Sequence, residues 1–220
     1  MPTEIKICGL SDEESVDAAL VAGADFVGFA FFARSPRNVT LERAAGLAQR
    51  IRGRAGIVAL TVDADDSVLG DIAETLRPDL LQLHGSETPE RVARVRETTG
   101  RPVMKVVGVA EAGDLIALGR YGVADRFMLD AKPPRDATRP GGNGVAFDWS
   151  ILRGFAPAKP WFLSGGLNPA NVAAALDATG ATGVDVSSGV ETAPGKKSPA
   201  LIHAFVAAVR TAGAPARLAG

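Results

Sequence analysis

Short apolar runs recur along the chain at regular intervals, and each is followed by a more polar segment with helical spacing. The runs are rich in β-branched residues or nearly continuous in apolar ones, which is typical of parallel strands that are covered on both faces. The pattern therefore predicts eight parallel strands, at residues 4–8, 25–32, 57–62, 80–84, 102–109, 126–130, 161–164 and 183–187.

Helix-start signals follow most of these runs. Ser11 and Glu14 have the spacing of a capping box ahead of an apolar pattern of helical period. Asn168, followed by a proline, is expected to cap a helix that runs to about residue 179. The other predicted N-caps are Thr40, Thr88 and Ser198. Strands and helices thus alternate from one end of the chain to the other.

Eight strand–helix units, of about 25–30 residues each, fit the ordinary size of a (β/α)8 barrel. A doubly wound open sheet is the structural alternative, but it usually has fewer strands and no partner that closes on the first strand. We therefore expect an α/β fold, a single (β/α)8 TIM barrel of eight parallel strands, with residues 1–220 forming one domain.

Composition narrows the kind of partner that the chain can bind. The 220 residues are 46% hydrophobic, and 24 basic against 25 acidic residues leave a net charge of −1. This balance argues against nucleic acid or an anionic membrane as the main partner. No apolar run is as long as a membrane span, the N-terminus lacks the pattern of a secretory signal, and one cysteine excludes an internal disulfide framework. We expect a cytoplasmic protein that binds a small molecule.

Alternation along the strands sorts the polar residues into inward and outward positions, because alternate side chains of a barrel strand face the interior. The isoleucines on either side of Lys6 suit the helix side, which sends Lys6 and Cys8 inward. The same reasoning sends Asp185 inward on the last strand. Since closure makes the first and last strands neighbours, we predict an ion pair between Lys6 and Asp185, because an inward ammonium group needs a partner.

His84 and Asp130 also point inward by this alternation, at the ends of their strands. Together with Cys8 they converge on the rim formed by the carboxyl ends of the strands, where barrel enzymes have their active sites. The chain has two histidines and no His, Asp or Glu cluster with ligand spacing, so no metal site is expected.

The seventh and eighth strands end in small residues, SGG at 164–166 and SSG at 187–189. Such endings leave no bulk around the backbone N–H groups, so an anion can approach them closely. Loops after strands seven and eight often form a phosphate cup in (β/α)8 barrels. We expect a phosphate group to be held by Gly165, Gly166, Ser187, Ser188 and Gly189.

An ordered set of segments resembles the phosphoribosylanthranilate isomerase family of tryptophan biosynthesis. The segments are KICGL (6–10), SPR (35–37), QLHG (82–85), LD (129–130), LSGGL (163–167), NV (171–172) and GVDVSSGVE (183–191). The resemblance implies an intramolecular oxidoreductase, an aldose-ketose isomerase. It would convert N-(5'-phosphoribosyl)anthranilate to 1-(2-carboxyphenylamino)-1-deoxyribulose 5-phosphate by an Amadori rearrangement, without metal or cofactor.

By this resemblance Asp130 is the general acid that protonates the furanose oxygen, and Cys8 is the general base that takes the proton from C2. An ordinary Asp has a pKa of about 4 and an ordinary Cys about 8.5, so both roles need help from their surroundings. From the residues alone, an inward cysteine is more often a small buried apolar side chain. An aspartate at a strand end is as often a structural hydrogen-bonding group as a catalyst.

The resemblance also implies that Arg37 binds the anthranilate carboxylate, for which a planar donor fork is suited. On the residues alone, a solvated arginine ahead of the second helix is the slightly favoured interpretation of Arg37, and Arg34 is a local competitor for the binding role. His84 either contacts the substrate or makes a structural hydrogen bond at the rim. Gly142 and Gly144, in the glycine-rich loop after the sixth strand, are expected to border the substrate.

Two other functions stay open on the sequence. A phosphosugar lyase or an indole-forming synthase on the same scaffold would want an additional Lys or Glu pair at the rim in place of a thiol. A phosphate-binding module without catalysis would keep the cup and leave the acid and the base idle. The expected partner is a phosphosugar, and the expected state is a monomer or a homodimer.

Overall fold

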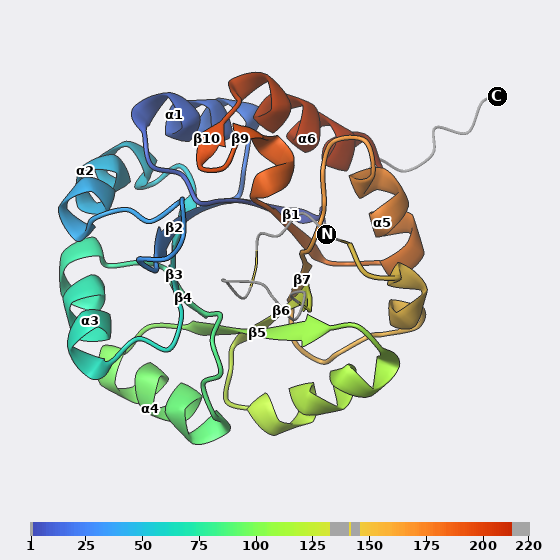
Figure 1. Ribbon diagram of the computed structural model, residues 1–220, viewed down its shortest axis with the longest axis horizontal. Helices are drawn as coiled ribbons and strands as arrows, with labels where there is room; N and C mark the ends of the chain where they lie inside the picture. Colours follow the sequence, from blue (N-terminus) through green and yellow to red (C-terminus); the bar gives the residue numbers. More distant parts are fainter. Residues whose placement is uncertain (1, 133–140, 142–145, 213–220) are drawn as a thin grey trace.

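The structure is a computed structural model that describes residues 2–132, 141 and 146–212. Eight parallel strands form a closed barrel in chain order, with β1 paired to both β2 and β8 (Figure 1). The predicted barrel is confirmed, and each strand lies where its apolar run predicts. The strands are β1 (Glu4–Cys8), β2 (Phe26–Phe31), β3 (Gly56–Thr61), β4 (Leu80–Leu83), β5 (Val103–Val109), β6 (Arg126–Ala131), β7 (Trp161–Leu163) and β8 (Gly183–Val186).

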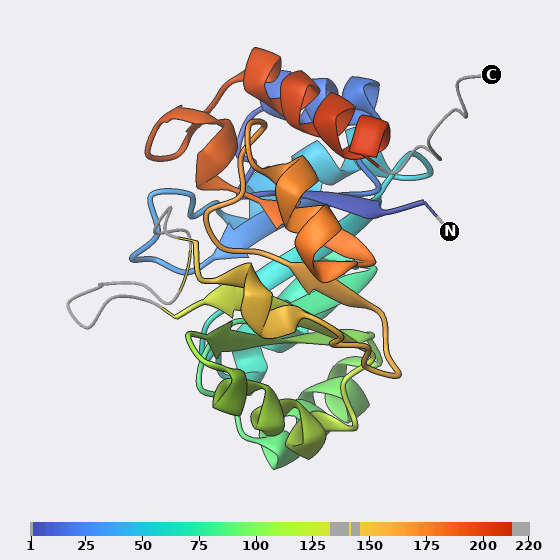
Figure 2. The same ribbon diagram turned by 90° about the vertical axis from the view of Figure 1, so that its right-hand side faces the viewer.

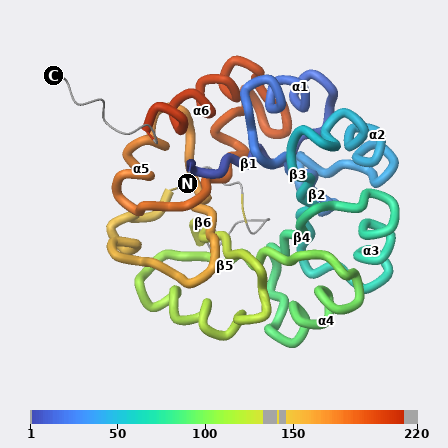
Figure 3. Tube along the Cα trace, turned by 180° about the vertical axis from the view of Figure 1, so that it is seen from behind, coloured from blue at the N-terminus to red at the C-terminus, as the bar shows by residue number. Residues whose placement is uncertain are grey.

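Helices surround the strands, as the views from the side and from behind show (Figures 2 and 3). The α-helices are α1 (Glu13–Ala22), α2 (Leu41–Ile51), α3 (Asp66–Asp71), α4 (Pro89–Thr99), α5 (Val172–Thr179) and α6 (Pro199–Ala212). A π-helical turn, η1 (Ile72–Leu76), continues α3, and three 3-10 helices are η2 (Ala112–Tyr121), η3 (Trp149–Leu152) and η4 (Ser188–Val190). Within the described residues, no helix combines the length and the apolar character needed to cross a bilayer.

After η4 the chain forms a short hairpin of β9 (Glu191–Ala193) and β10 (Lys196–Lys197) before α6 begins. The hairpin lies on the face of the barrel opposite the N-terminus (Figure 2). It therefore stands beside the carboxyl ends of the strands.

Two helix starts differ from the sequence prediction. The N-cap of α1 is Asp12, whose side chain accepts a hydrogen bond from the Ser15 N–H at 2.8 Å, and the carbonyl of Ser11 instead accepts from Arg43. The carboxylate one residue later thus caps the helix in place of the serine. Asn168 forms a turn with the N–H of residue 170, and α5 begins only after Asn171.

Apolar side chains fill the lower part of the barrel interior. The interior cluster consists of Val58, Leu80, Met104, Val106, Met128 and Phe162, while most other buried apolar residues lie between strands and helices. Arg126 covers this cluster at the amino ends of the strands. Its guanidinium lies over the rings of Phe26 and Phe162, 5.4 and 5.8 Å from their centroids, and pairs with Glu4. The polar side chains at the other end of the strands are thus supported from below by a packed core.

Candidate active site

The carboxyl ends of the strands surround a cleft with an empty volume of about 700 Å³, its open mouth included. Most of the predicted site residues line this cleft, and they are Cys8, Arg37, His84, Asp130, Gly165, Gly166, Ser187 and Ser188. Gly189 is not among the lining residues. Gly142 and Gly144 lie outside the described residues, although Gly141 lines the cleft.

A buried ion pair joins the first and last strands, as alternation predicts. Lys6 Nζ donates to Asp185 Oδ1 at 2.7 Å, and the second oxygen of Asp185 accepts from Ser164 Oγ at 3.2 Å. Burial alone lowers the pKa of Lys6, but the charges of Asp185 and of an ionised Cys8 outweigh burial and leave the pKa above its ordinary value. Lys6 is therefore a cation at neutral pH.

Cys8 lies beside this pair, in space that Gly28 leaves open. A Cβ atom on Gly28 would lie 3.0 Å from Cys8 Sγ and 3.1 Å from Lys6 Nζ. Burial raises the pKa of the Cys8 thiol, and the nearby Lys6 cation offsets only part of the effect, so the pKa lies above that of an ordinary cysteine. Cys8 thus rests as a thiol at neutral pH, next to a cation that stabilises its thiolate form.

Asp130 lies at the end of β6 against the imidazole of His84. His84 Nε2 is 3.1 Å from Asp130 Oδ2, and the amide nitrogen of Gln82 is 3.3 Å from His84 Nδ1. With Gln82 as the donor, Nδ1 accepts and the ring proton sits on Nε2, facing the carboxylate. The Nε2 contact is short but poorly aligned, so this nitrogen has no well-formed hydrogen bond among the described residues. His84 thus contacts the candidate acid itself.

The loops after β7 and β8 need glycine for two different reasons. Gly165 has a φ of +87°, and a Cβ there would lie 2.6 Å from the backbone nitrogen of Ala131 and 3.0 Å from Asp130 Oδ1. A Cβ on Gly189 would lie 1.9 Å from the carbonyl oxygen of Leu167. Gly165 therefore lets the β7 loop pass beside Asp130, while Gly189 packs the two loops together from behind.

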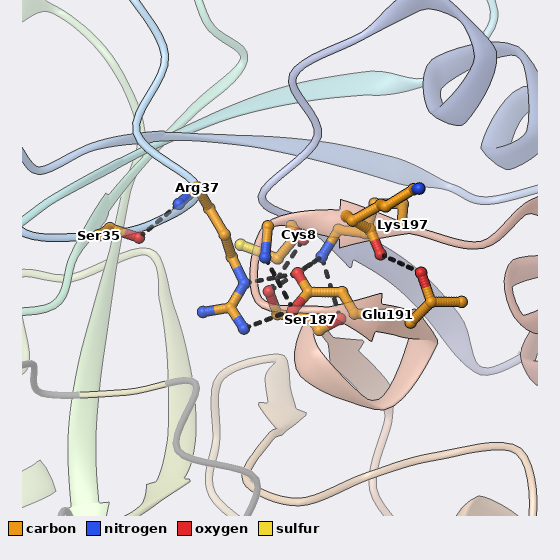
Figure 4. A network of polar contacts seen from close by, with 9 residues as sticks. Cys8, Ser35, Arg37, Ser187, Glu191 and Lys197 are labelled. Carbon is orange, nitrogen blue, oxygen red and sulfur yellow. Dashed lines mark hydrogen bonds and ion pairs between the residues drawn. The ribbon is translucent and has the colours of Figure 1, made fainter.

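Arg37 extends into the cleft from the loop after β2, where its side chain is 6% exposed (Figure 4). Its Nε and Nη2 donate to the two oxygens of Glu191, at 2.7 and 2.8 Å. Arg34, the other candidate for this position, is exposed and does not line the cleft.

Sequence reasoning assigned no role to Glu191 or to Lys197, both of which come from the hairpin. Lys197 Nζ donates to Glu191 Oε1 at 2.7 Å and to the carbonyl oxygen of Ser187 at 3.0 Å. Ser187 Oγ in turn donates to the carbonyl oxygen of Cys8 at 3.1 Å. Glu191 ends the segment GVDVSSGVE, but it lies beyond the strand, where alternation no longer says which way a side chain points.

In the part of the chain that the structure describes, no group of three or more His, Cys, Asp or Glu side chains is arranged to hold a metal ion. The polar groups of the cleft are instead an aspartate, a thiol, an imidazole and an arginine, together with small residues in two loops. A closed (β/α)8 barrel with ionisable side chains gathered at the carboxyl ends of its strands defines a barrel enzyme.

The family follows from comparison with known proteins. The model of the family described as N-(5'phosphoribosyl)anthranilate (PRA) isomerase matches residues 5–208. The chain belongs to this family, as its ordered motifs predict.

Relatives and solved structures agree with this assignment. The N-(5'-phosphoribosyl)anthranilate isomerase of Rhodopseudomonas palustris (strain BisB5) is 56% identical over 211 residues, which cover 96% of this chain and 97% of that protein. The corresponding protein of Nitrobacter hamburgensis is 57% identical over 209 residues, covering 94% of this chain and 93% of that protein. The crystal structure of the Thermotoga maritima isomerase superposes with a TM-score of 0.86 at 33% identity, covering 95% of this chain and 99% of that one.

Proposed function

We propose that this chain isomerises N-(5'-phosphoribosyl)anthranilate to 1-(2-carboxyphenylamino)-1-deoxyribulose 5-phosphate in tryptophan biosynthesis, with Asp130 as the general acid and Cys8 as the general base. Residues 1–220 would act as one catalytic domain on a phosphosugar substrate. Membership of the isomerase family supports the reaction. A solved isomerase in complex with the reduced form of this product, at 31% identity and a TM-score of 0.82, supports the substrate class.

The order of the groups around the cleft supports the roles of Asp130 as acid and Cys8 as base. The acid ends β6 and the thiol ends β1, while the glycine and serine loops that end β7 and β8 lie between them. A sugar whose phosphate is held by those loops would therefore have Asp130 on one side and Cys8 on the other.

The two groups then divide the proton transfers. Asp130 gives a proton to the furanose oxygen, the bond from that oxygen to C1 breaks, and the nitrogen lone pair forms the Schiff base. Cys8, as the thiolate, takes the proton from C2, and the resulting enaminol tautomerises to the ketose. Because the pKa of Cys8 is raised, only a small fraction of the resting enzyme holds the thiolate, and the Lys6 cation beside it maintains that fraction.

His84 would act on the acid. Its Nε2 lies 3.1 Å from Asp130 Oδ2, while Asp130 Oδ1 accepts a hydrogen bond from the Ala131 N–H at 2.9 Å, so the imidazole and this backbone amide together would orient the carboxyl group in the cleft. Arg37 would bind the anthranilate carboxylate with the guanidinium donors that Glu191 leaves unused.

The test is a turnover assay that follows the loss of freshly made phosphoribosylanthranilate. Cys8→Ala and Asp130→Asn should each lower kcat by about two or more orders of magnitude. The affinity for the reduced product should stay nearly unchanged, because neither side chain holds the phosphate. Unchanged turnover in Cys8→Ala would remove the base from that position, and retained ring opening in Asp130→Asn would remove the acid.

Two further expectations accompany the reaction. Turnover should be insensitive to a chelator, since the proposed steps use side chains alone. We also propose that the enzyme works in the cytoplasm as a monomer or a homodimer, which size-exclusion chromatography with light scattering would distinguish.

A further inference from the structure

The guanidinium group of Arg37 has two edges that can each grip a carboxylate. Glu191 occupies the edge formed by Nε and Nη2, with bonds of 2.7 and 2.8 Å. Nη1 makes no hydrogen bond to any residue that the structure describes. The edge formed by Nη1 and the second proton of Nη2 is thus left for a planar bidentate partner.

Arg37 is also held so that it cannot turn this edge away. Its stem lies on Gly9, where a Cβ atom would be 2.6 Å from Arg37 Cδ. Its backbone N–H donates to Ser35 Oγ at 3.1 Å. The hairpin turn packs on the same loop, since a Cβ on Gly195 would lie 2.4 Å from the carbonyl oxygen of Pro36.

Lys197 holds Glu191 from the other side and ties it to the loop that ends β8. It donates to Glu191 Oε1 at 2.7 Å and to the oxygens of Ser187 at 3.0 and 3.2 Å (Figure 4). The side chains of Glu191 and Lys197 are 4% and 1% exposed. Burial lowers the pKa of Lys197 from its ordinary value of 10.5, and the neighbouring Glu191 carboxylate opposes this only in part. The Arg37 guanidinium stays charged throughout, so it is the cation that an incoming carboxylate would meet.

We propose that Glu191 is a positioning residue for recognition of the substrate's carboxylate. It grips one edge of the Arg37 guanidinium and presents the other edge to the carboxylate of the anthranilate ring. This inference rests on the proposed function. Glu191 does not touch the substrate, so its effect passes through Arg37 and is felt by ligands that carry the ring carboxylate.

The test compares two ligands that differ in this one group. They are the reduced product and the same compound with an unsubstituted phenylamino group, each titrated into the wild-type protein and into Glu191→Gln by calorimetry. Loss of the ion pair between Glu191 and Arg37 should lower the affinity for the carboxylated ligand roughly 10–100-fold and the affinity for the phenyl ligand less than about 3-fold. In turnover, KM should rise while kcat stays within about 3-fold.

Glu13→Gln is the matched control, because Glu13 also forms a two-pronged pair with an arginine, Arg43, but at the surface and outside the cleft. It should leave both affinities unchanged. Equal weakening of the two ligands in Glu191→Gln would assign Glu191 to the phosphate loop and overturn the inference, as would no weakening at all.

Glu191→Asp keeps the charge and shortens the reach. Its discrimination between the two ligands should fall between those of the wild type and Glu191→Gln, and it serves as the test if circular dichroism shows that the glutamine variant does not fold. A wild-type discrimination in Glu191→Asp would count against the inference. Failure of the wild-type protein to convert the substrate would instead overturn the proposed function itself.

Discussion

Removal of one partner of the Lys6–Asp185 pair should destabilise the barrel more than any exposed ion pair does. Lys6 is fully buried and the side chain of Asp185 is 7% exposed, so each single variant leaves an uncompensated charge in the interior. In Asp185→Asn the Lys6 ammonium loses its carboxylate, and in Lys6→Met the carboxylate keeps only the bond from Ser164 Oγ. Breaking a buried pair in this way costs about 3–5 kcal/mol.

The double variant Lys6→Met/Asp185→Asn removes both charges and should recover part of this loss, so that its cost is smaller than the sum of the single costs by about 2 kcal/mol. The assay is urea unfolding at neutral pH, followed by far-UV circular dichroism. A loss of 3 kcal/mol lowers the midpoint by about 1–3 M. Asp17→Asn, which breaks the exposed pair of Asp17 and Arg50, is the control and should keep the wild-type midpoint.

The same pair makes a prediction for alkaline pH. Since the pKa of Lys6 is raised in the folded state, the folded protein binds more protons than the unfolded chain between the two pKa values. The contribution of Lys6 is therefore fully present below its ordinary pKa of 10.5 and is lost as the pH rises through the folded-state value above it. In the urea experiment at neutral pH, wild-type midpoints in Lys6→Met and Asp185→Asn would refute the reasoning. A cost in the double variant equal to the sum of the two single costs would refute it as well.

The value of kcat/KM should keep rising above pH 9.0, because burial raises the pKa of Cys8 above that value; a profile that is flat from neutral pH upward would contradict this. Burial raises the pKa of Glu191, but Arg37 and Lys197 outweigh burial and leave it below 4.5, so Glu191 stabilises the fold above pH 4.5 and loses this effect as the pH falls through its folded-state pKa. As the pH is lowered below 4.5, the urea midpoint of Glu191→Gln should accordingly fall less steeply than that of the wild type. Equal pH dependence of the two midpoints would contradict this role of Glu191. Gly189→Ala should weaken inhibition by inorganic phosphate and lower the melting temperature, because its Cβ would lie 1.9 Å from the Leu167 carbonyl oxygen. Inhibition as strong as in the wild type would contradict the role of Gly189 in packing the two loops that are proposed to bind phosphate. In contrast, Gly46→Ala, on an open helical position, should stabilise the fold by about 1 kcal/mol and raise the melting temperature by about 2–4 °C, and a lower melting temperature would disprove this.

The alternation of side chains explains why so much of the barrel interior could be predicted. Once eight apolar runs were counted, the period of two in each strand fixed which residues face inward, and closure fixed which strands are neighbours. Lys6 and Asp185 are 179 positions apart, yet these two rules were sufficient to pair them. The same alternation predicted that His84, Asp130 and Ser187 point inward, and all three line the cleft.

Contacts made outside the strands could not be predicted in this way. Arg37 and Glu191 are 154 positions apart; Arg37 lies in a loop and Glu191 begins the short strand β9 outside the barrel, so alternation along the barrel strands orients neither side chain. A second buried pair, Lys105 with Glu87 at 2.6 Å, was missed for a related reason. Alternation sends Lys105 toward the helices, but the loop that brings Glu87 to it carries no repeating pattern.

Helix starts show a third limit, which is competition between adjacent acceptors. Ser11 and Asp12 are both good N-caps, and the sequence does not say which of them adopts the extended conformation of a cap. In the structure Asp12 does so, with φ −141° and ψ 162°. Such a shift moves a helix end by one residue and leaves the site unchanged.

The seam between β1 and β8 has a consequence for protein synthesis. During translation Lys6 and Cys8 leave the ribosome well before Asp185, Ser187 and Lys197. At about 5–20 residues per second, roughly 10–40 s pass before the 179 positions between Lys6 and Asp185 have been added. During that time the thiol has neither its buried surroundings nor its neighbouring ion pair. A nascent chain released before residue 185 would therefore contain the proposed base but lack the environment that sets its pKa.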